Sequence, residues 1–384
     1  MKGSWWVGES ELDEKQSEII TYSPDTSFLI IGPPGCGKTN LLLLRANYLY
    51  LSGLKDILII VFTRNLRDFI ALGGINYSFP DTKVVTSTRW AMDLLFQHGV
   101  SFSRKDDFDS NRKQLLSDVE QLCKDNDIKN LYDAILLDEA QDYSPDEIAV
   151  FRKLTKRLII AGDKKQQIYK GKDCLAGLAN IVDQTTVLEC HYRNGQQICS
   201  TADGLGEKWP DYQCMLPGCN YDEKSKPSSV ATRSCVNIQE EITKTIKQIT
   251  IQLKAYPDEL IGVITPRNRE LAIIWDEILD SSFASISVRR DSNAPLDFSD
   301  KARVVVTTMH GAKGLEFRAV HILGSEFLKN FPNQRQLAFT SVTRCKTSLF
   351  ICHTNQLPGY LESAIASLNP VPELPEISDL FGGE

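Results

Sequence analysis

Short runs of apolar, often β-branched residues recur along the first half of the chain, each bounded by polar or turn-forming residues. They read SFLII, ILIIVF, KVVTS, AILLD and RLIIAG, and helix-like segments such as LLLLRANYL lie between them. Strands of a parallel sheet are buried on both faces, so they show continuous apolar runs rather than strict alternation. The first half therefore predicts an α/β layer built on a parallel sheet.

The second half repeats this texture with LIGVITP, SISV, RVVVTT, AVHIL and SLFICH, which predicts a second α/β layer. The stretch 204–229 is rich in Gly, Pro, Ser and charge, as in a surface excursion of that second layer. The closing NPVPELPEISDLFGGE has the composition of a flexible tail. We therefore expect an N-terminal domain over 1–188, a C-terminal domain over 189–360 and an acidic tail over 361–384.

Composition and charge narrow the class of protein. The 384 residues are 42% hydrophobic and 24% charged, as in a soluble protein with two domains, and no run of eighteen uncharged apolar residues occurs. We expect no membrane partner and a cytoplasmic location. The net charge of −7 argues against indiscriminate nucleic-acid binding. Five acidic residues lie in 361–384 without any Lys or Arg, so the rest carries only −2 and can still form a nucleic-acid groove.

The ten cysteines occur at irregular spacings, which is typical of reduced thiols rather than of a disulfide framework. Cys214 and Cys219 form the only tight pair outside the motifs. A zinc site there would need two more ligands, for which Cys190 and His191 are the nearest candidates. The favoured interpretation is incidental thiols, and Cys36 is likewise taken as a neutral choice because the backbone of its loop does the binding.

The stretch GPPGCGKT, Gly32–Thr39, matches the phosphate-binding pattern G-x-x-x-x-G-K-[ST] and lies between a strand-like and a helix-like run. Gly35 and Gly37 would let backbone N–H groups wrap the phosphates. Lys38 would reach the β- and γ-phosphates, and the Thr39 hydroxyl would bind Mg²⁺ at a helix N-terminus. The stretch predicts ATP and Mg²⁺ as cofactors.

A pair of carboxylates follows a later apolar run, in LYDAILLDEAQDYSPDEI. Asp138 and Glu139 come directly after the predicted strand, at the edge where the phosphate loop is also expected. One carboxylate can hold the metal while its neighbour polarises an attacking water. We therefore predict Asp138 as the metal residue and Glu139 as the general base.

Six ordered segments resemble the superfamily 1 helicases of the UvrD/Rep type. They are LDEKQ with Gln16, DEAQD, GDKKQQIY, HYRN, TTMHGAKGLEF and TSVTRCK. The resemblance covers residues 12–346. It implies two tandem RecA-like P-loop domains with parallel sheets, ATP in the cleft between them, and 3′ to 5′ movement on single-stranded DNA, with RNA not excluded.

A γ-phosphate between two domains can report its presence only if groups from both sides touch it. Gln166, Arg193 and Arg344 are the natural sensors, and arginine suits the task because its planar fork binds phosphate oxygens in two places. By resemblance, Arg344 is the arginine finger. The resemblance also implies three contacts to the rest of the nucleotide: Gln16 to adenine, Tyr192 stacked on adenine and Glu316 to the ribose.

The nucleic-acid track across the top of both domains is implied by resemblance as well. Its expected residues are Phe62, Thr63, Arg64, Thr86, Trp90, Tyr169, Lys170 and His310. Aromatic faces for bases and positive charge for phosphates are the groups that such a track needs. Phe62 and Trp90 could equally be core aromatics.

The chain departs from the family in length. The gap from Trp90 to Tyr132 and the short turn NAPLDFSDK before Arg303 leave no room for the two sizeable inserts that touch duplex DNA in family members. FTR stands where the family has FTN, and a Trp expected after QQIY is absent. Two hypotheses therefore stay open: a single-stranded DNA translocase or helicase, or a nucleic-acid-triggered regulatory ATPase subunit of a repair or anti-phage defence complex with a protein partner such as a nuclease. A small-molecule kinase does not explain Arg193, KGLEF and VTR together.

Overall fold

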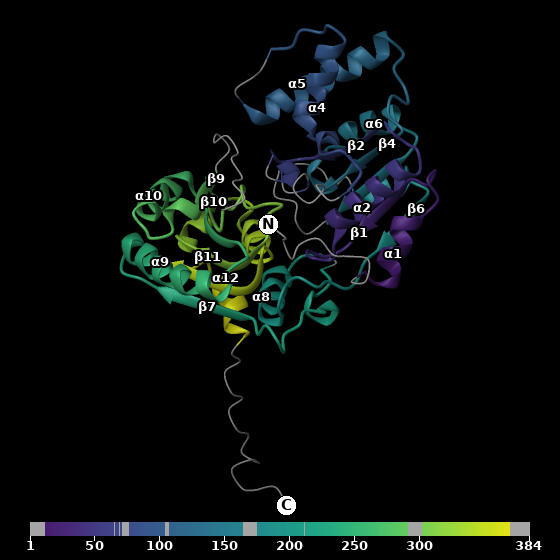
Figure 1. Ribbon diagram of the computed structural model, residues 1–384. Coiled ribbons are helices and arrows are strands. Elements are labelled where there is room, and N and C mark those ends of the chain that lie inside the picture. The colour runs from purple at the N-terminus through teal and green to yellow at the C-terminus, as the bar shows by residue number, and fades with distance from the viewer. Residues whose placement is uncertain are drawn as a thin grey trace, which may run out of the picture.

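Two six-stranded sheets, both parallel throughout, organise the molecule. The computed structural model describes residues 12–64, 66–68, 70, 77–103, 107–163, 175–210, 212–290 and 302–368. The strand orders are β3-β2-β4-β5-β1-β6 and β7-β12-β11-β8-β10-β9. Figure 1 shows the sheets as two lobes, the first in purple to blue and the second in green to yellow. The predicted α/β class with two parallel sheets is confirmed.

The first sheet takes its central strands from the apolar runs of the first half. Its strands are β1 (Phe28–Ile31), β2 (Ile57–Val61), β3 (Val84–Thr86), β4 (Ala134–Leu137), β5 (Leu158–Gly162) and β6 (Gln184–Val187). Its helices are α1 (Glu14–Thr21), α2 (Lys38–Leu51), α4 (Ser87–Gln97), α5 (Phe108–Asp125), α6 (Pro145–Leu154) and α7 (Leu175–Leu178), with short 3₁₀ turns η2 (Asp81–Lys83) and η3 (Ala140–Asp142). The apolar faces of α1 and α2 pack on one side of the sheet, and those of α4, α5 and α6 on the other.

The second sheet is covered on both faces in the same way. Its strands are β7 (Ser229–Ser234), β8 (Ile261–Thr265), β9 (Ser287–Arg290), β10 (Val304–Thr308), β11 (Phe317–Ile322) and β12 (Cys345–His353). Its helices are α8 (Gln196–Gly206), α9 (Ile238–Ala255), α10 (Asn268–Leu279), α11 (Gln334–Val342) and α12 (Gly359–Ala366), with 3₁₀ turns η5 (Leu216–Gly218), η6 (Ala284–Ile286) and η7 (Ser325–Asn330). Helices α8, α11 and α12 share one core, and α9 and α10 the other.

The expected tail begins later than its composition indicates. Residues 361–366 belong to α12, where Leu361 and Ala364 are buried. The backbone of Ala364 lies so close to α8 that a Cβ built on Gly204 would come within 2.8 Å of its Cα. The domain boundaries at 188 and 360 stay predictions, and 369–384 lie outside the described residues.

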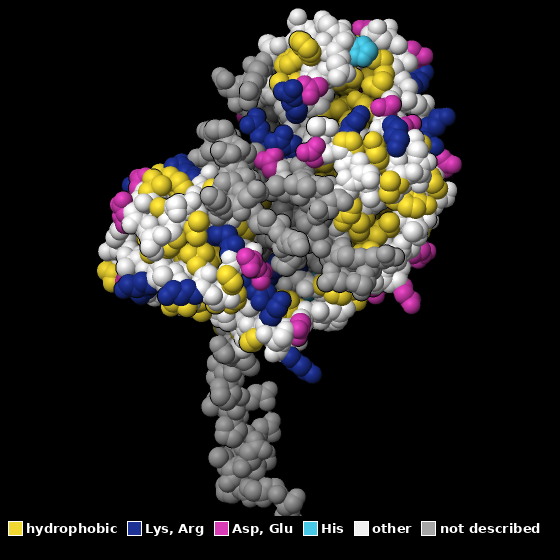
Figure 2. All heavy atoms as spheres, in the orientation of Figure 1, with side chains coloured by type: hydrophobic (Ala, Val, Ile, Leu, Met, Phe, Trp, Pro, Cys, Tyr) yellow, Lys and Arg dark blue, Asp and Glu magenta, His cyan; other side chains and the backbone are white. Residues whose placement is uncertain are grey.

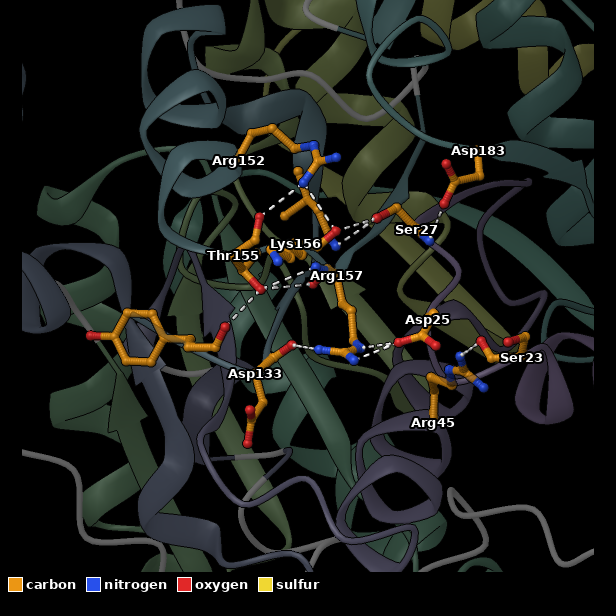
Figure 3. Close-up of polar contacts among 12 residues, drawn as sticks. Ser23, Asp25, Ser27, Arg45, Asp133, Arg152, Thr155, Lys156, Arg157 and Asp183 are labelled. Atoms are coloured by element: carbon orange, nitrogen blue, oxygen red, sulfur yellow. Dashed lines mark hydrogen bonds and ion pairs between the residues drawn. The ribbon is translucent and has the colours of Figure 1, made fainter. Parts of the chain in front are cut away.

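A polar network ties together the segments that enter the first sheet (Figure 3). The Arg157 guanidinium donates through Nε to Asp25 at 3.1 Å and through NH1 to the Asp133 carbonyl at 3.2 Å. The backbone N–H of Ser27 donates to Asp183 at 2.7 Å. All these residues precede strands, so the network fixes the N-terminal edge of the sheet. The candidate functional site lies at the opposite edge, where the parallel strands end.

No helix within the described residues combines the length and the apolar character needed to cross a membrane.

Candidate nucleotide site between the two sheets

The phosphate-binding loop connects β1 to α2 with two glycines in left-handed backbone conformation. Gly35 has φ of 80° and Gly37, the residue that caps α2, has φ of 87°. Side chains strain such a backbone, which explains glycine at both positions. The Lys38 ammonium donates to the carbonyl oxygens of Gly32 at 2.8 Å and Pro33 at 3.0 Å. The predicted loop and its lysine are therefore at the start of α2, as a phosphate site requires.

Thr39 and Asp138 meet beside this loop although 99 positions separate them. The Thr39 hydroxyl donates to Asp138 Oδ2 at 2.7 Å, because β4 is two strands from β1 and both end at the same edge. Burial and the charge of Glu139 raise the pKa of Asp138 to about 6. This pair of adjacent hydroxyl and carboxylate oxygens fits Mg²⁺, which prefers oxygen ligands. A bound cation would also stabilise the negative charge that burial disfavours.

Glu139 has positive φ, at 52°, and its backbone N–H donates to Asp138 Oδ1 at 2.9 Å. Its carboxylate accepts a hydrogen bond from the amide of Gln141, whose oxygen in turn accepts from the Asp163 backbone N–H at 2.9 Å. Burial acts to raise the pKa of Glu139, but the positive charges of Lys313, Arg344 and Lys38 outweigh it and hold the pKa below its ordinary value. Glu139 is thus a buried carboxylate that stays ionised.

Arg193 comes from the segment before α8 and packs directly on the phosphate loop. A Cβ built on Gly35 would lie 2.6 Å from the Cβ of Arg193, and the backbone N–H of Tyr192 donates to the Gly35 carbonyl at 3.2 Å. The Arg193 guanidinium pairs with Glu316, whose other oxygen lies 3.8 Å from the Lys346 ammonium. Glu316 therefore binds an arginine in this structure.

Arg344 approaches the same cavity from the turn before β12. It is 2% exposed and donates to the carbonyl oxygens of Thr340 at 3.2 Å and Leu315 at 3.4 Å. Burial and the nearby charge of Arg193 lower its pKa to about 10, so it stays a cation at neutral pH. The cavity is lined by Pro34, Gly35, Gly37, Lys38, Thr39, Asn40, Leu66, Asp138, Glu139, Arg193, Gly314, Glu316 and Arg344.

Lys313 is a site residue that the sequence analysis missed. Its ammonium lies 2.6 Å from Asp142 Oδ2 and 3.9 Å from Glu139 Oε2, and the residue is 1% exposed. It belongs to the loop between β10 and β11, so the second half places a buried cation against the carboxylates of the first. The available signal was a lysine inside TTMHGAKGLEF together with a second acid in DEAQD.

Gln16 and Tyr192 both bind the backbone of the phosphate loop. Gln16 donates to the Cys36 carbonyl at 3.1 Å and completes a capping box with Asp13 at the start of α1. Tyr192 donates from its hydroxyl to Asp13 at 2.8 Å and is 40% exposed. Both residues contact the phosphate loop, and their contacts to adenine stay predictions.

The residues expected on the nucleic-acid track differ in exposure. Trp90 is 6% exposed, donates to the Tyr132 hydroxyl at 3.1 Å and packs on Phe151 with 4.9 Å between ring centroids, so it is a core aromatic in this structure. Phe62 is 8% exposed and lies under the Arg112 guanidinium at 4.6 Å.

The polar members of that track also have local roles. The Thr86 hydroxyl caps α4 by accepting from Arg89 N at 3.3 Å, and the Thr63 hydroxyl accepts from Leu66 N at 3.2 Å. Arg64 is exposed and His310 half-buried. Gln166, Tyr169 and Lys170 lie outside the described residues. On the face in Figure 2, basic and acidic side chains of the described residues are interspersed, as the near-neutral charge predicts.

Two family models match the chain. Residues 16–172 match the AAA domain, and residues 303–352 match the UvrD-like helicase C-terminal domain. A probable DNA helicase of Mycoplasma pneumoniae (strain ATCC 29342 / M129 / Subtype 1) is 24% identical over 243 residues, covering 56% of this chain and 42% of that protein. The chain thus spans less than half the length of that relative. The solved structure of the PRRSV helicase is similar over 90% of this chain and 56% of that chain, at 17% identity and a TM-score of 0.42.

Proposed function

We propose that the chain, which matches the AAA domain and the UvrD-like helicase C-terminal domain, hydrolyses ATP between its two sheets and moves 3′ to 5′ along single-stranded DNA. One observation carries the proposal. The phosphate loop and two carboxylates of the first half line one cavity together with Arg193 and Arg344 of the second half. Lys313, also of the second half, lies 3.9 Å from Glu139, one of these carboxylates. A site assembled from two domains can convert the presence of a γ-phosphate into domain closure.

The first half holds the nucleotide and its metal in this proposal. Backbone N–H groups at Gly35 and Gly37 bind phosphate oxygens, and the Lys38 ammonium moves from its carbonyl partners to the β- and γ-phosphates. Thr39 and Asp138 hold Mg²⁺, which supplies neutralisation of phosphate charge. The 2.7 Å contact between their oxygens supports this assignment.

Glu139 serves as the general base. Its lowered pKa keeps the carboxylate ionised at neutral pH, and the hydrogen bond from Gln141 fixes its orientation. It accepts the proton of a water directed at the γ-phosphate, while Arg193 and Arg344 contact the phosphate oxygens from the other side. Arg193 must exchange Glu316 for phosphate to do so, which links nucleotide binding to a rearrangement of the second half.

The test is ATP hydrolysis by the purified chain with no nucleic acid, with single-stranded DNA and with single-stranded RNA, beside Glu139→Gln. We expect stimulation by DNA and a loss of kcat of at least about 100-fold in the variant. Glu147→Gln is a control outside the cavity, since Glu147 pairs with Arg112. Displacement of streptavidin from one labelled end of the strand then reads the polarity. Hydrolysis that ignores both DNA and RNA would refute the translocase.

The short connections support a second candidate, a regulatory ATPase whose closure controls a protein partner such as a nuclease. Among the described residues, α4 and β4 are joined with only α5 between them. A motor without accessory elements has little surface for splitting a duplex. Strand-stimulated hydrolysis without movement of the chain along the strand would favour this candidate over the translocase.

A further inference from the structure

A cluster of one histidine and two cysteines lies beneath the segment that carries Tyr192 and Arg193. His191 and Cys219 are held side by side by a parallel bridge, in which His191 N donates to the Gly218 carbonyl at 2.9 Å and Asn220 N donates to the His191 carbonyl at 2.8 Å. Cys199 joins them from the first turns of α8. Three separate stretches of chain therefore converge on one point.

The donor atoms are already spaced as in a metal site. The ligand atoms of the three side chains all lie within 4.8 Å of one another, and Cys199 Sγ is 3.7 Å from His191 Nε2. In a tetrahedral zinc site, bonds of about 2.3 Å to sulfur and about 2.0 Å to nitrogen place neighbouring donors about 3.5–3.8 Å apart. Only small side-chain movements separate the observed cluster from that geometry.

The protonation chemistry of the cluster also suits a cation. His191 Nε2 lies 2.9 Å from the Met215 carbonyl, so it carries the hydrogen, and Nδ1 is buried with no hydrogen-bond partner among the described residues. Binding a cation through Nε2 requires this hydrogen to move to Nδ1 and gives up the bond to the Met215 carbonyl, which the bond to the cation must outweigh. The Cys199 and Cys219 thiols both donate to the Asn194 carbonyl, at 3.3 and 3.2 Å.

We propose that His191, Cys199 and Cys219 bind one thiophilic divalent cation of the zinc class. Two thiolates and an imidazole are the ligand types that zinc prefers, and the fourth position is left to an oxygen ligand. Each thiol releases its proton to solvent when it binds, so the two thiolates and the dication form a neutral set that can be buried. The zinc site considered from the sequence consists of Cys190, His191, Cys214 and Cys219. In the proposed site, Cys199 takes the place of Cys190 and Cys214, which are both exposed.

The cation would act on the position of the nucleotide sensor. His191 is two residues before Arg193, and Asn194 follows it with its side chain bound to the carbonyls of Thr343 and Cys345. Loading the cluster would tie this segment to α8 and to the stretch around Cys219. The binding itself does not depend on the proposed ATPase, so its test needs no activity measurement.

The experiment measures the metal content of the full chain, purified without chelator, by elemental mass spectrometry, followed by zinc and cobalt titration of chelator-treated protein. We expect one zinc per chain and, with cobalt, a thiolate-to-metal charge-transfer band. Cys199→Ser and Cys219→Ser should each abolish the band and weaken zinc binding by more than the roughly 10–100-fold typical of a lost outer partner. Cys190→Ser and Cys214→Ser are matched controls that should bind normally.

Circular dichroism must show that each variant is folded, and Cys219→Ser, at a partly exposed position, keeps the test valid if Cys199→Ser is not. Folded wild-type chain that takes up no zinc after reduction would overturn the proposal. So would equal zinc binding by Cys219→Ser and wild type, or a Cys199 to Cys219 disulfide whose reduction creates no metal site.

Discussion

At the scale of single residues, the buried carboxyl of Asp138 destabilises the folded protein when it is ionised and no cation is bound. The pKa of its carboxyl is raised to about 6 because the group is buried beside Glu139. A raised carboxyl pKa means that the folded state binds the proton more tightly than the unfolded chain, so the folded state loses stability as pH rises from about 4 through about 6. The proposed role of Asp138 in binding Mg²⁺ uses the ionised form, since a carboxylate binds this cation better than a protonated carboxyl does.

Asp138→Asn is therefore expected to stabilise the nucleotide-free protein at pH 7. The gain in the free energy of unfolding should be about 1–3 kcal/mol at pH 7 and should fall to a small fraction of that near pH 4, where Asp138 is protonated in the folded state and about half protonated in the unfolded chain. Urea denaturation at the two pH values measures it, with the exposed Asp258 changed to Asn as the control. A variant that is less stable than wild type at pH 7 contradicts this account.

Trp90 separates a core role from a nucleic-acid role. Since its ring packs on Phe151, Trp90→Ala should lower the free energy of unfolding by about 3–5 kcal/mol. Trp90→Phe keeps a ring in the core and loses the bond to Tyr132. Its affinity for single-stranded DNA, measured by fluorescence anisotropy, should equal that of wild type. A weakened affinity in a folded Trp90→Phe protein would restore the stacking role that the resemblance implies.

At the scale of elements, Asn194 joins two segments that each carry one arginine of the site. Its amide donates to the carbonyls of Thr343 at 2.9 Å and Cys345 at 2.6 Å, and the residue is fully buried. Asn194→Ala should cost about 2–3 kcal/mol of stability by removing two hydrogen bonds. It should also lower kcat, because Arg193 and Arg344 lose their common support.

Thr347→Val is the matched control on β12, since it removes the hydrogen bond to Tyr221 without touching either arginine segment. Denaturation and steady-state ATPase rates compare the two variants. If both lose stability and neither loses kcat, Asn194 has only a structural role.

The elements also show where sequence patterns stop being informative. Central strands such as β2 and β4 are buried at every position and were visible as continuous apolar runs. The edge strands β6, QTTV, and β7, SVATRS, were not expected as strands, because an edge strand needs few apolar residues. The acidic composition of 361–384 predicts a tail, but residues 361–366 belong to α12, whose Leu361 and Ala364 face the core.

The residues of the candidate site also differ in whether a sequence pattern can indicate them. The phosphate loop and the pair Asp138 and Glu139 are local patterns that can be recognised within ten residues of sequence. The roles of Lys313 and Asn194 depend on partners that adjoin them only in the folded chain: 149 positions separate Asn194 from Thr343. No period or motif indicates such a pairing, so these residues emerge only from the tertiary structure.

At the scale of the whole molecule, Lys313 of the second half affects the protonation of Glu139 in the first half. Its charge is the largest of those that lower the pKa of Glu139 against the effect of burial. In Lys313→Met the pKa of Glu139 should rise, so the base becomes protonated at a higher pH. The acid limb of the kcat profile should then move to higher pH than in wild type, so that kcat falls earlier as pH is lowered from neutrality into the acid range.

Lys346→Met is the control, because Lys346 neighbours Glu316 and not Glu139. ATPase rates across that pH range, at saturating nucleotide and DNA, decide the matter. A uniform drop in kcat with an unchanged profile would mean that Lys313 contributes to alignment alone. A shift of the acid limb to higher pH that is confined to Lys313→Met would mean that the charge of Lys313 keeps Glu139 ionised. Separation of the two halves, which moves Lys313 away, would then inactivate the base.

The hydrogen bonds of Lys38 to its own loop have one more consequence. The ammonium is already paired with the carbonyls of Gly32 and Pro33, so an incoming ligand competes with the loop itself for this cation. A ligand with β- and γ-phosphates offers charged oxygens in exchange for neutral ones and wins that competition. AMP and adenosine offer nothing in the same place. We therefore expect the loop to rank ligands by the length of their phosphate chain, before any group of the second lobe is engaged.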